Sequence, residues 1–233
     1  MRLRHKPLAG APLWLALAAA LAGCGGSSPS AGVASKTPAQ ILAAAKTAAD
    51  GAATVHVAGS IESEGQPISL DMELVAHKGG RGQLELGGLG IQLLDLDRTV
   101  FVKGNAAFYS HFLGAGAPQQ LRGRWLEASA QSGALAQLAS LADLHEVIDT
   151  ALEDHGALSP ATPTTIDGHQ ALAITDRSDG GTLYVAATGA PYPLEIAEAG
   201  TGAGRLVFDR WNQPVTLAPP AGAVNIDQLK SRL

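Results

Sequence analysis

A two-residue alternation of apolar and polar side chains, beginning at Thr54, constrains the fold of this 233-residue chain more than any other feature. Successive residues of a β-strand point to opposite faces of a sheet, so this period predicts an antiparallel hairpin with one apolar and one polar face. A turn at 64–67 separates the two strands. The apolar face of this hairpin is expected to carry Val55, Val57, Ile61, Leu70, Met72 and Leu74.

Further short strands and a few helices are predicted around this hairpin. A helix is expected over Pro38–Asp50, because Thr37 and Gln40 can form a capping box and Pro38 suits the first helical position. A helical turn at 106–113, a brief strand at 124–127 and one or two helices within 133–155 interrupt the strands. The other predicted strands are 81–86, 91–96, 99–103, 164–166, 170–175, 182–186, 193–199 and 205–210. This order predicts an α+β fold in which one curved antiparallel sheet wraps on a few helices.

The N-terminal residues follow the order of elements found in a bacterial lipoprotein signal peptide. Arg2, Arg4 and Lys6 precede an apolar stretch at 8–20, and Leu21-Ala22-Gly23-Cys24 then matches the lipobox. Residues 1–23 are therefore expected to be removed, leaving Cys24 as the first mature residue, acylated with diacylglycerol and palmitate. The expected location is the extracytoplasmic face of the cell membrane, to which the acylated Cys24 would bind.

Three other interpretations of this segment remain open. A transmembrane anchor would need about 20 apolar residues, and this stretch is shorter and contains Pro12. The segment could also be an ordinary secretory signal cleaved elsewhere, or a buried core helix, which its basic start disfavours. Cys24 is the single cysteine and has no disulfide partner, and lipidation would explain an unpaired cysteine in an exported protein.

Composition limits the domain organisation and the possible partners of the mature protein. Residues 24–36 are rich in Gly, Ser and Ala, which is typical of a flexible tether, and 37–233 have the length of one domain. Removal of the three basic residues of the signal leaves 13 basic against 21 acidic side chains, a net charge of −8. That charge disfavours a nucleic-acid partner.

Catalytic motifs are mostly absent, so no enzyme activity, cofactor or metal is expected. His145-Glu146-Val147-Ile148-Asp149 resembles the zinc-protease motif but ends in Asp where the second histidine ligand is required. The pairs Glu62/Glu64 and Asp71/Glu73 lie on the polar face of the hairpin, where solvated charges are the ordinary case. The glycines of 200–204 lie between strands and predict a turn.

The apolar face of the hairpin has two interpretations. Gly and Ala at positions where larger side chains would fill space suggest a hollow that could hold a ligand. The same apolar residues could instead form an ordinary core, and the pattern alone favours the core.

The segment Thr182–Leu194 resembles a signature of the actinobacterial lipoproteins of the LppX/LprG type. The turn Ile166-Asp167-Gly168-His169, the lipobox, the helix at Pro38, the strand around Val55 and the segment reaching Trp125 match in the same order. This resemblance implies a LolA- and LolB-like half-barrel of antiparallel strands, closed by helices around an apolar cavity. It also implies binding of acylated lipids or glycolipids and their carriage within the cell envelope. The six apolar residues of the hairpin are then candidate cavity lining, and an envelope exporter is a further partner.

A non-carrier role is the alternative. Such a protein would be a scaffold or a ligand-sensing module of the envelope, with a filled core and a contact surface near Tyr184–Tyr192. A hydrolase ranks third, because it would need a buried acid–base pair in a cleft.

Overall fold

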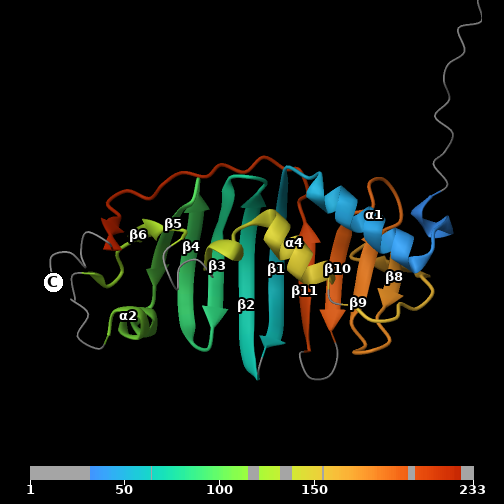
Figure 1. Cartoon of the computed structure of the whole chain (residues 1–233), viewed down its shortest axis with the longest axis horizontal. Coiled ribbons are helices and arrows are strands. Elements are labelled where there is room, and N and C mark those ends of the chain that lie inside the picture. Colours follow the sequence, from blue (N-terminus) through green and yellow to red (C-terminus); the bar gives the residue numbers. More distant parts are fainter. Residues whose placement is uncertain are drawn as a thin grey trace, which may run out of the picture. The chain divides into compact units, whose positions relative to one another are not determined.

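One antiparallel sheet with helices along one of its faces organises the chain (Figure 1). The computed structural model describes residues 32–63, 65–114, 121–131, 138–153, 155–198 and 203–226. The strands within them are β1 (Thr54–Ser63), β2 (Gln66–Val75), β3 (Gly79–Leu86), β4 (Leu89–Leu96), β5 (Thr99–Gly104), β6 (Leu126–Ser129), β7 (Thr162–Ile166), β8 (His169–Thr175), β9 (Thr182–Ala186), β10 (Pro193–Glu198), β11 (Gly204–Asp209) and β12 (Val224–Asn225). The helices are a 3-10 turn η1 (Val33–Ser35), α1 (Pro38–Asp50), α2 (Ala106–Leu113) and α4 (Leu144–Glu153), and residues 138–140 are also helical.

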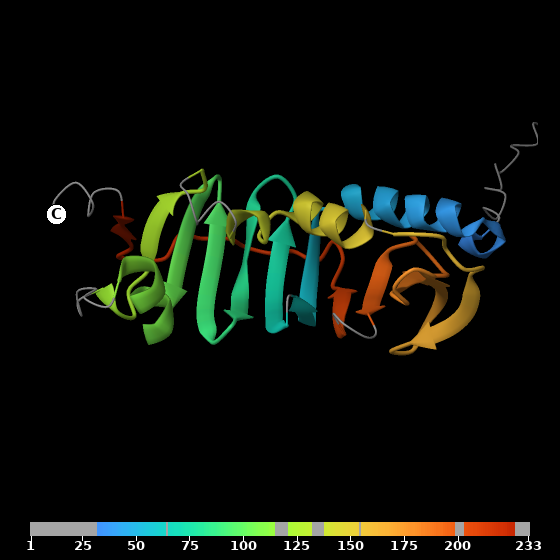
Figure 2. The ribbon, with the colours of Figure 1, turned by 60° about the horizontal axis from the view of Figure 1, so that its bottom comes forward.

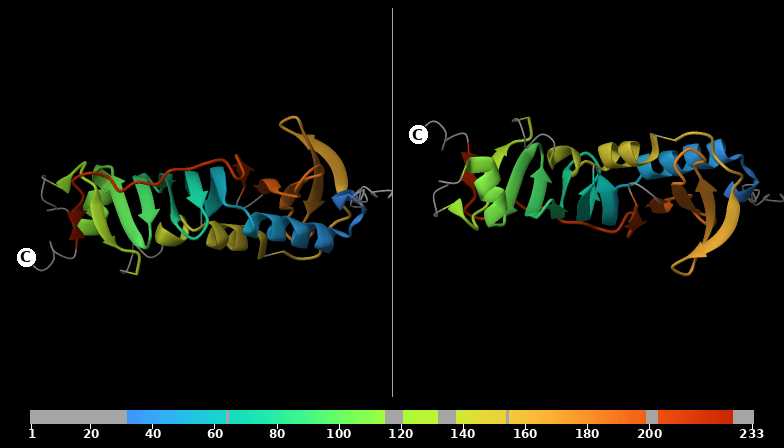
Figure 3. Two further views of the ribbon diagram at one scale, coloured as in Figure 1. Left: turned by 90° about the horizontal axis from the view of Figure 1, so that it is seen from above. Right: turned by 90° about the horizontal axis from the view of Figure 1, so that it is seen from below.

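The sheet consists of two meanders joined at their first and last strands. Its order is β12-β6-β5-β4-β3-β2-β1-β11-β10-β9-β8-β7, so β1 lies in the middle, between β2 and β11. All neighbours are antiparallel except β12, which pairs with β6 in parallel through two residues. Figure 3 shows that the sheet bends most strongly at its β7–β9 end. The predicted α+β fold with a curved antiparallel sheet is confirmed.

Local signals explain where α1 begins and how it packs. The Thr37 hydroxyl accepts a hydrogen bond from Gln40 N (3.3 Å), and Gln40 Oε1 accepts one from Thr37 N (3.0 Å). The predicted capping box is therefore present and fills two otherwise unpaired donors of the first turn. One stripe of the helix, Ile41, Ala45 and Ala49, is fully buried. Val33 of η1, within the segment predicted as tether, packs against the same part of the core.

Helix α4 begins at a different cap. Asp143 Oδ1 accepts hydrogen bonds from the backbone N–H groups of His145 (2.9 Å) and Glu146 (3.1 Å). Leu144, Ile148 and Leu152 recur every fourth residue and are buried against the sheet. Figure 2 shows α1 and α4 along the same side of the sheet, and the C-terminal half of α1 lies beside α4. Together these two helices form what we call the helical cover, and the sheet face beneath it is the inner face.

The C-terminal segment was not foreseen. From Arg210 to 223 the chain runs without regular structure along the face opposite the helical cover and ends in β12 (Figure 3). Asn212 fastens its start, because the Asn212 side chain accepts a hydrogen bond from Ala53 N (2.7 Å). Further along, Ala218 and Pro220 line a groove with the outer-face residue Leu94. This segment lacks an apolar period, which is why periodicity could not reveal it.

The N-terminal predictions lie outside the described residues. Residues 1–23 and Cys24 belong to this part, as does most of the segment predicted as tether. Among the helices that are described, none is long and apolar enough to cross a membrane.

Candidate functional site: the helix-covered face of the sheet

All six predicted lining residues point to the inner face. Strands β1 and β2 pair so that Val55 lies opposite Leu74, Val57 opposite Met72 and Ile61 opposite Ile68. Leu70 lies opposite Gly59, on the same side. Because side chains alternate along each strand, these pairs place the six residues on one face, as the alternation predicted.

The register continues as apolar rows across the sheet. The first row is Val55–Leu74–Gly80–Asp95–Val100–Ala128, and the second is Phe208–Val57–Met72–Gly82–Leu93–Val102–Leu126. The third is Ile174–Leu183–Ile196–Leu206–Gly59–Leu70–Leu84–Ile91, and the fourth is Ile61–Ile68–Leu86–Leu89. The third row is the longest and joins both meanders.

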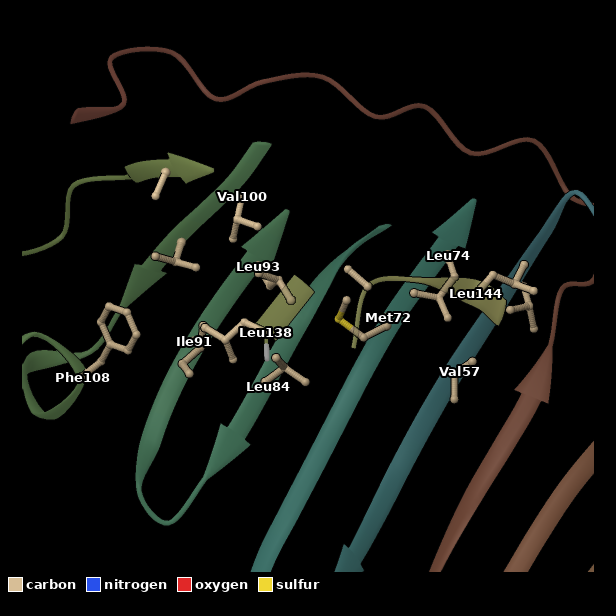
Figure 4. Close-up of a cluster of buried hydrophobic side chains, with 14 of the residues drawn as sticks. Val57, Met72, Leu74, Leu84, Ile91, Leu93, Val100, Phe108, Leu138 and Leu144 are labelled. Atoms are coloured by element: carbon tan, nitrogen blue, oxygen red, sulfur yellow. The ribbon is translucent and has the colours of Figure 1, made fainter. Parts of the chain in front are cut away.

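The first two rows form the core. Val55, Val57, Met72 and Leu74 are at most 1% exposed and belong to one apolar cluster with Leu144 and Ile148 of α4. Figure 4 shows the labelled members of this cluster on β1–β5 pointing toward α4 and Leu138. Four of the six predicted lining residues are therefore sealed under the helical cover.

The third and fourth rows of the inner face are covered only in part. Ile61 and Leu70 are half-buried, as are their neighbours Ile68, Leu89 and Leu206. Leu86 in the fourth row is 40% exposed, which is unusual for a leucine on the inner face of a sheet. We call Ile61, Ile68, Leu70, Leu86, Leu89 and Leu206 the apolar strip.

Glycines of the first two rows do not mark empty space. A Cβ at Gly80 would lie 2.7 Å from Leu74 Cδ2 and 3.0 Å from the Ala142 carbonyl oxygen. A Cβ at Gly82 would lie 2.5 Å from Met72 Sδ. The expectation that glycine here indicates a hollow is wrong, because neighbouring side chains and the chain before α4 fill these positions.

A cavity of about 70 Å³ does lie where the third row passes beneath both helices of the cover. Its apolar wall is Leu42 of α1, Ala151 and Leu152 of α4, and Leu158, Ile174, Leu183 and Ile196. Its polar rim is His155, Asp176, Asp179, Thr182 and Glu198. The third row thus connects this cavity directly to the apolar strip.

Asp176 holds the loop at the cavity rim in place. Its carboxylate accepts hydrogen bonds from Ser178 N (2.7 Å), Ser178 Oγ (2.5 Å) and Gly156 N. These hydrogen bonds, that of the Ser178 hydroxyl first, hold the pKa of Asp176 below its ordinary value. The side chain is only 7% exposed and has a structural role.

Polar contacts fasten the two helices of the cover to each other. Lys46 of α1 forms ion pairs with Asp149 and with Glu153 (3.8 Å) of α4. The hydrogen bond to Asp149 raises the pKa of Lys46. His145 Nδ1 lies 3.6 Å from Asp50 at the end of α1. These pairs are partly exposed, so each contributes little to stability.

The side chains of the zinc-like motif have separate partners on α1. His145 lies near Asp50, whereas Asp149 faces Lys46. Among the described residues no group of three or more His, Cys, Asp or Glu side chains is placed to hold a metal ion. Near the predicted contact surface, Tyr192 is occupied within the domain, because its ring stacks on Trp211 with centroids 4.6 Å apart.

Residues from the second half of the chain complete the site and were missed. In the third row, Leu183 and Ile196 line the cavity, and Leu206 continues the row toward Leu70. The alternation within 182–186 and 204–209 was a usable signal for them. The pairing of β11 with β1, which brings them to the hairpin, was not predictable from either segment alone.

Comparison with known proteins identifies the fold. No family model and no curated protein sequence matches the chain. The crystal structure of LprF from Mycobacterium bovis is similar, with a TM-score of 0.54 and 16% identity over 78% of this chain and 96% of LprF. The lipoprotein LppX from Mycobacterium tuberculosis gives a TM-score of 0.50 and 18% identity over 78% of this chain and all of LppX (100%). The chain has the fold of the mycobacterial lipoproteins LprF and LppX, as the resemblance implied.

Proposed function

We propose that this protein is a membrane-anchored lipoprotein that binds the acyl chains of lipids or glycolipids on its inner face and carries them within the cell envelope. The continuous third row carries this proposal, because it forms one apolar track from the cavity at Leu183 to the apolar strip at Leu70. An acyl chain is a linear apolar ligand, and such a track matches it in shape and chemistry. Acylated Cys24 would hold the domain at the membrane.

The helical cover must move for a chain to enter. Ligand pockets usually measure about 300–1,000 Å³, whereas the cavity beneath α1 and α4 measures about 70 Å³. In the described arrangement the cover is therefore closed over the third row. Each methylene buried from water contributes about 0.8 kcal/mol, and this gain would offset the loss of contacts between the cover and the third row.

This mechanism requires no catalytic residue, and we propose a non-enzymatic protein. Binding, release and transfer would depend on apolar burial and on the position of the cover. The small cavity equally favours the alternative of a non-carrier envelope module with a filled core. The experiment that separates the two roles is the identification of bound lipid.

We would purify the Cys24→Ser protein from its own cells and measure bound lipid by native mass spectrometry. Leu206→Asn places a polar group in the third row, and Val207→Asn makes a comparable change on the opposite face of the same strand. We expect lipid on the parent protein and on Val207→Asn, and at least a tenfold loss on Leu206→Asn. Lipid-free parent protein, particularly with a stoichiometric protein partner, would reject the carrier role.

A further inference from the structure

Asp95 is a buried carboxylate beneath the start of α4. It lies in the first row of the inner face, opposite Gly80 on β3 and Val100 on β5. The residue is 9% exposed, and Oδ1 has no hydrogen-bond partner among the described residues. A buried carboxylate with an unpartnered oxygen is costly when ionised, and a structure that keeps one calls for an explanation.

The carboxylate of Asp143 affects the pKa of Asp95. Burial, together with the negative charges of Asp143 and Asp97, raises the pKa of Asp95 to about 6, against one backbone hydrogen bond from Leu96 that lowers it. Asp143 is the residue that caps α4. The chain just before it presses on the sheet, since the Ala142 carbonyl oxygen would lie 3.0 Å from a Cβ at Gly80.

Among the described residues, no basic side chain near the start of α4 forms a hydrogen bond with Asp95 Oδ1. His77, in the β2–β3 turn, and His145 of α4 pack against each other with tilted rings whose centroids are 5.0 Å apart. Lys78 and Arg98 lie in the turns that follow β2 and β4, and Asp97 N donates to the Lys78 carbonyl oxygen. Because His145 belongs to the start of α4 and His77 packs against it, an experiment must separate the effect of this histidine pair from that of Asp95.

We propose that Asp95 is a proton-operated latch for the helical cover: the neutral acid keeps the start of α4 seated on the sheet, and ionisation favours its release. The latch regulates access to the inner face and in that respect rests on the proposed function. Its effect on the cover itself needs no ligand.

The direction follows from the raised pKa. A carboxyl that is more basic in the closed form favours that form below the pKa of the exposed acid, near 3.8, and loses this contribution as the pH rises through about 6. One pKa unit corresponds to a tenfold change in an equilibrium constant. Between pH 5 and 8 the open fraction of the cover should therefore rise about tenfold.

Hydrogen–deuterium exchange of the ligand-free Cys24→Ser protein tests the latch, with rates corrected for intrinsic pH dependence. In the parent protein, protection of the α4 amides should fall by that factor from pH 5 to pH 8, while β8 amides stay protected. Asp95→Asn should keep α4 protected throughout, and His145→Asn should retain the parent's pH dependence.

Two outcomes overturn the latch: α4 protection in the parent that does not depend on pH, or pH dependence that persists in Asp95→Asn. Loss of the pH dependence in His145→Asn would assign the switch to the histidine pair instead. None of these measurements contains lipid. A failed latch therefore leaves the lipid assignment untouched, and the reverse also holds.

Discussion

Shortening Ile148 to alanine should make the protein less stable and its inner face easier to occupy. Ile148 lies in the middle of α4, has no exposed surface and packs in the core cluster with the first two rows. Removing a fully buried isoleucine side chain typically costs about 2–5 kcal/mol. We take about 3 kcal/mol as the loss for the closed form.

The consequence for binding depends on whether the cover moves. When α4 is lifted, Ile148 has already lost its contacts in the parent protein, so the substitution penalises only the closed form. Since about 1.4 kcal/mol corresponds to a tenfold change, the open fraction should rise about a hundredfold. Apparent affinity scales with the fraction of binding-competent protein, so it should rise by at least about tenfold.

The assay is a fluorescence titration of delipidated protein with cis-parinaric acid, beside urea unfolding of the same samples. Phe101→Leu is the control, because Phe101 is 6% exposed and lies on β5 beside Val100 and Val102, pointing to the opposite face. It should lower stability with no change in affinity. An Ile148→Ala protein that is less stable but binds the probe no more tightly would refute the idea that ligand displaces α4.

Three further substitutions test local features. Asp176→Asn should lower the melting temperature more at pH 7 than at pH 3, because a carboxylate with a lowered pKa contributes stability above its unfolded pKa and loses it as the pH falls through its folded pKa. Equal losses at both pH values would exclude the ionised form as the stabilising one. Thr37→Ala should cost about 1 kcal/mol in urea unfolding by removing the cap of α1, whereas Thr47→Ala, on an exposed turn of the same helix, should cost less. Gly80→Val should destabilise the protein by about 1–3 kcal/mol or more, because its Cβ would lie 2.9 Å from the Glu73 carbonyl oxygen. Gly51→Ala is the control and should be tolerated, because its Cβ would lie 3.5 Å from its nearest neighbour. Equal effects of the two changes would contradict the packing described at Gly80.

Much of the fold follows from signals within short stretches of sequence. Alternation between Thr54 and Val75 predicted the first hairpin and the shared face of its apolar residues, because the direction of a strand side chain depends only on its position. The capping residues likewise located the start of α1.

Features that depend on distant parts of the chain were not predictable in this way. The pairing of β1 with β11 places His56 opposite Asp209, and no signal in the sequence of either strand indicates which strand it pairs with. For the same reason alternation could not tell Val57, which is sealed under α4, from Ile61, which is half-buried. The burial of residues along one face depends on where the helical cover packs. The glycine content suggested a hollow, whereas Gly80 and Gly82 allow close packing.

The central place of β1 has a consequence for folding during synthesis. Strands β1–β6 precede the rest of the sheet, yet β1 pairs with β11 and β6 with β12, both contributed by the last 30 residues or so of the chain. Until those residues arrive, the first meander has two unpaired strand edges, and open edges favour association with other chains. A chain interrupted before Gly204 would keep both edges open. We therefore expect chaperones or rapid completion of the chain to matter more for this topology than for a sheet built in sequence order.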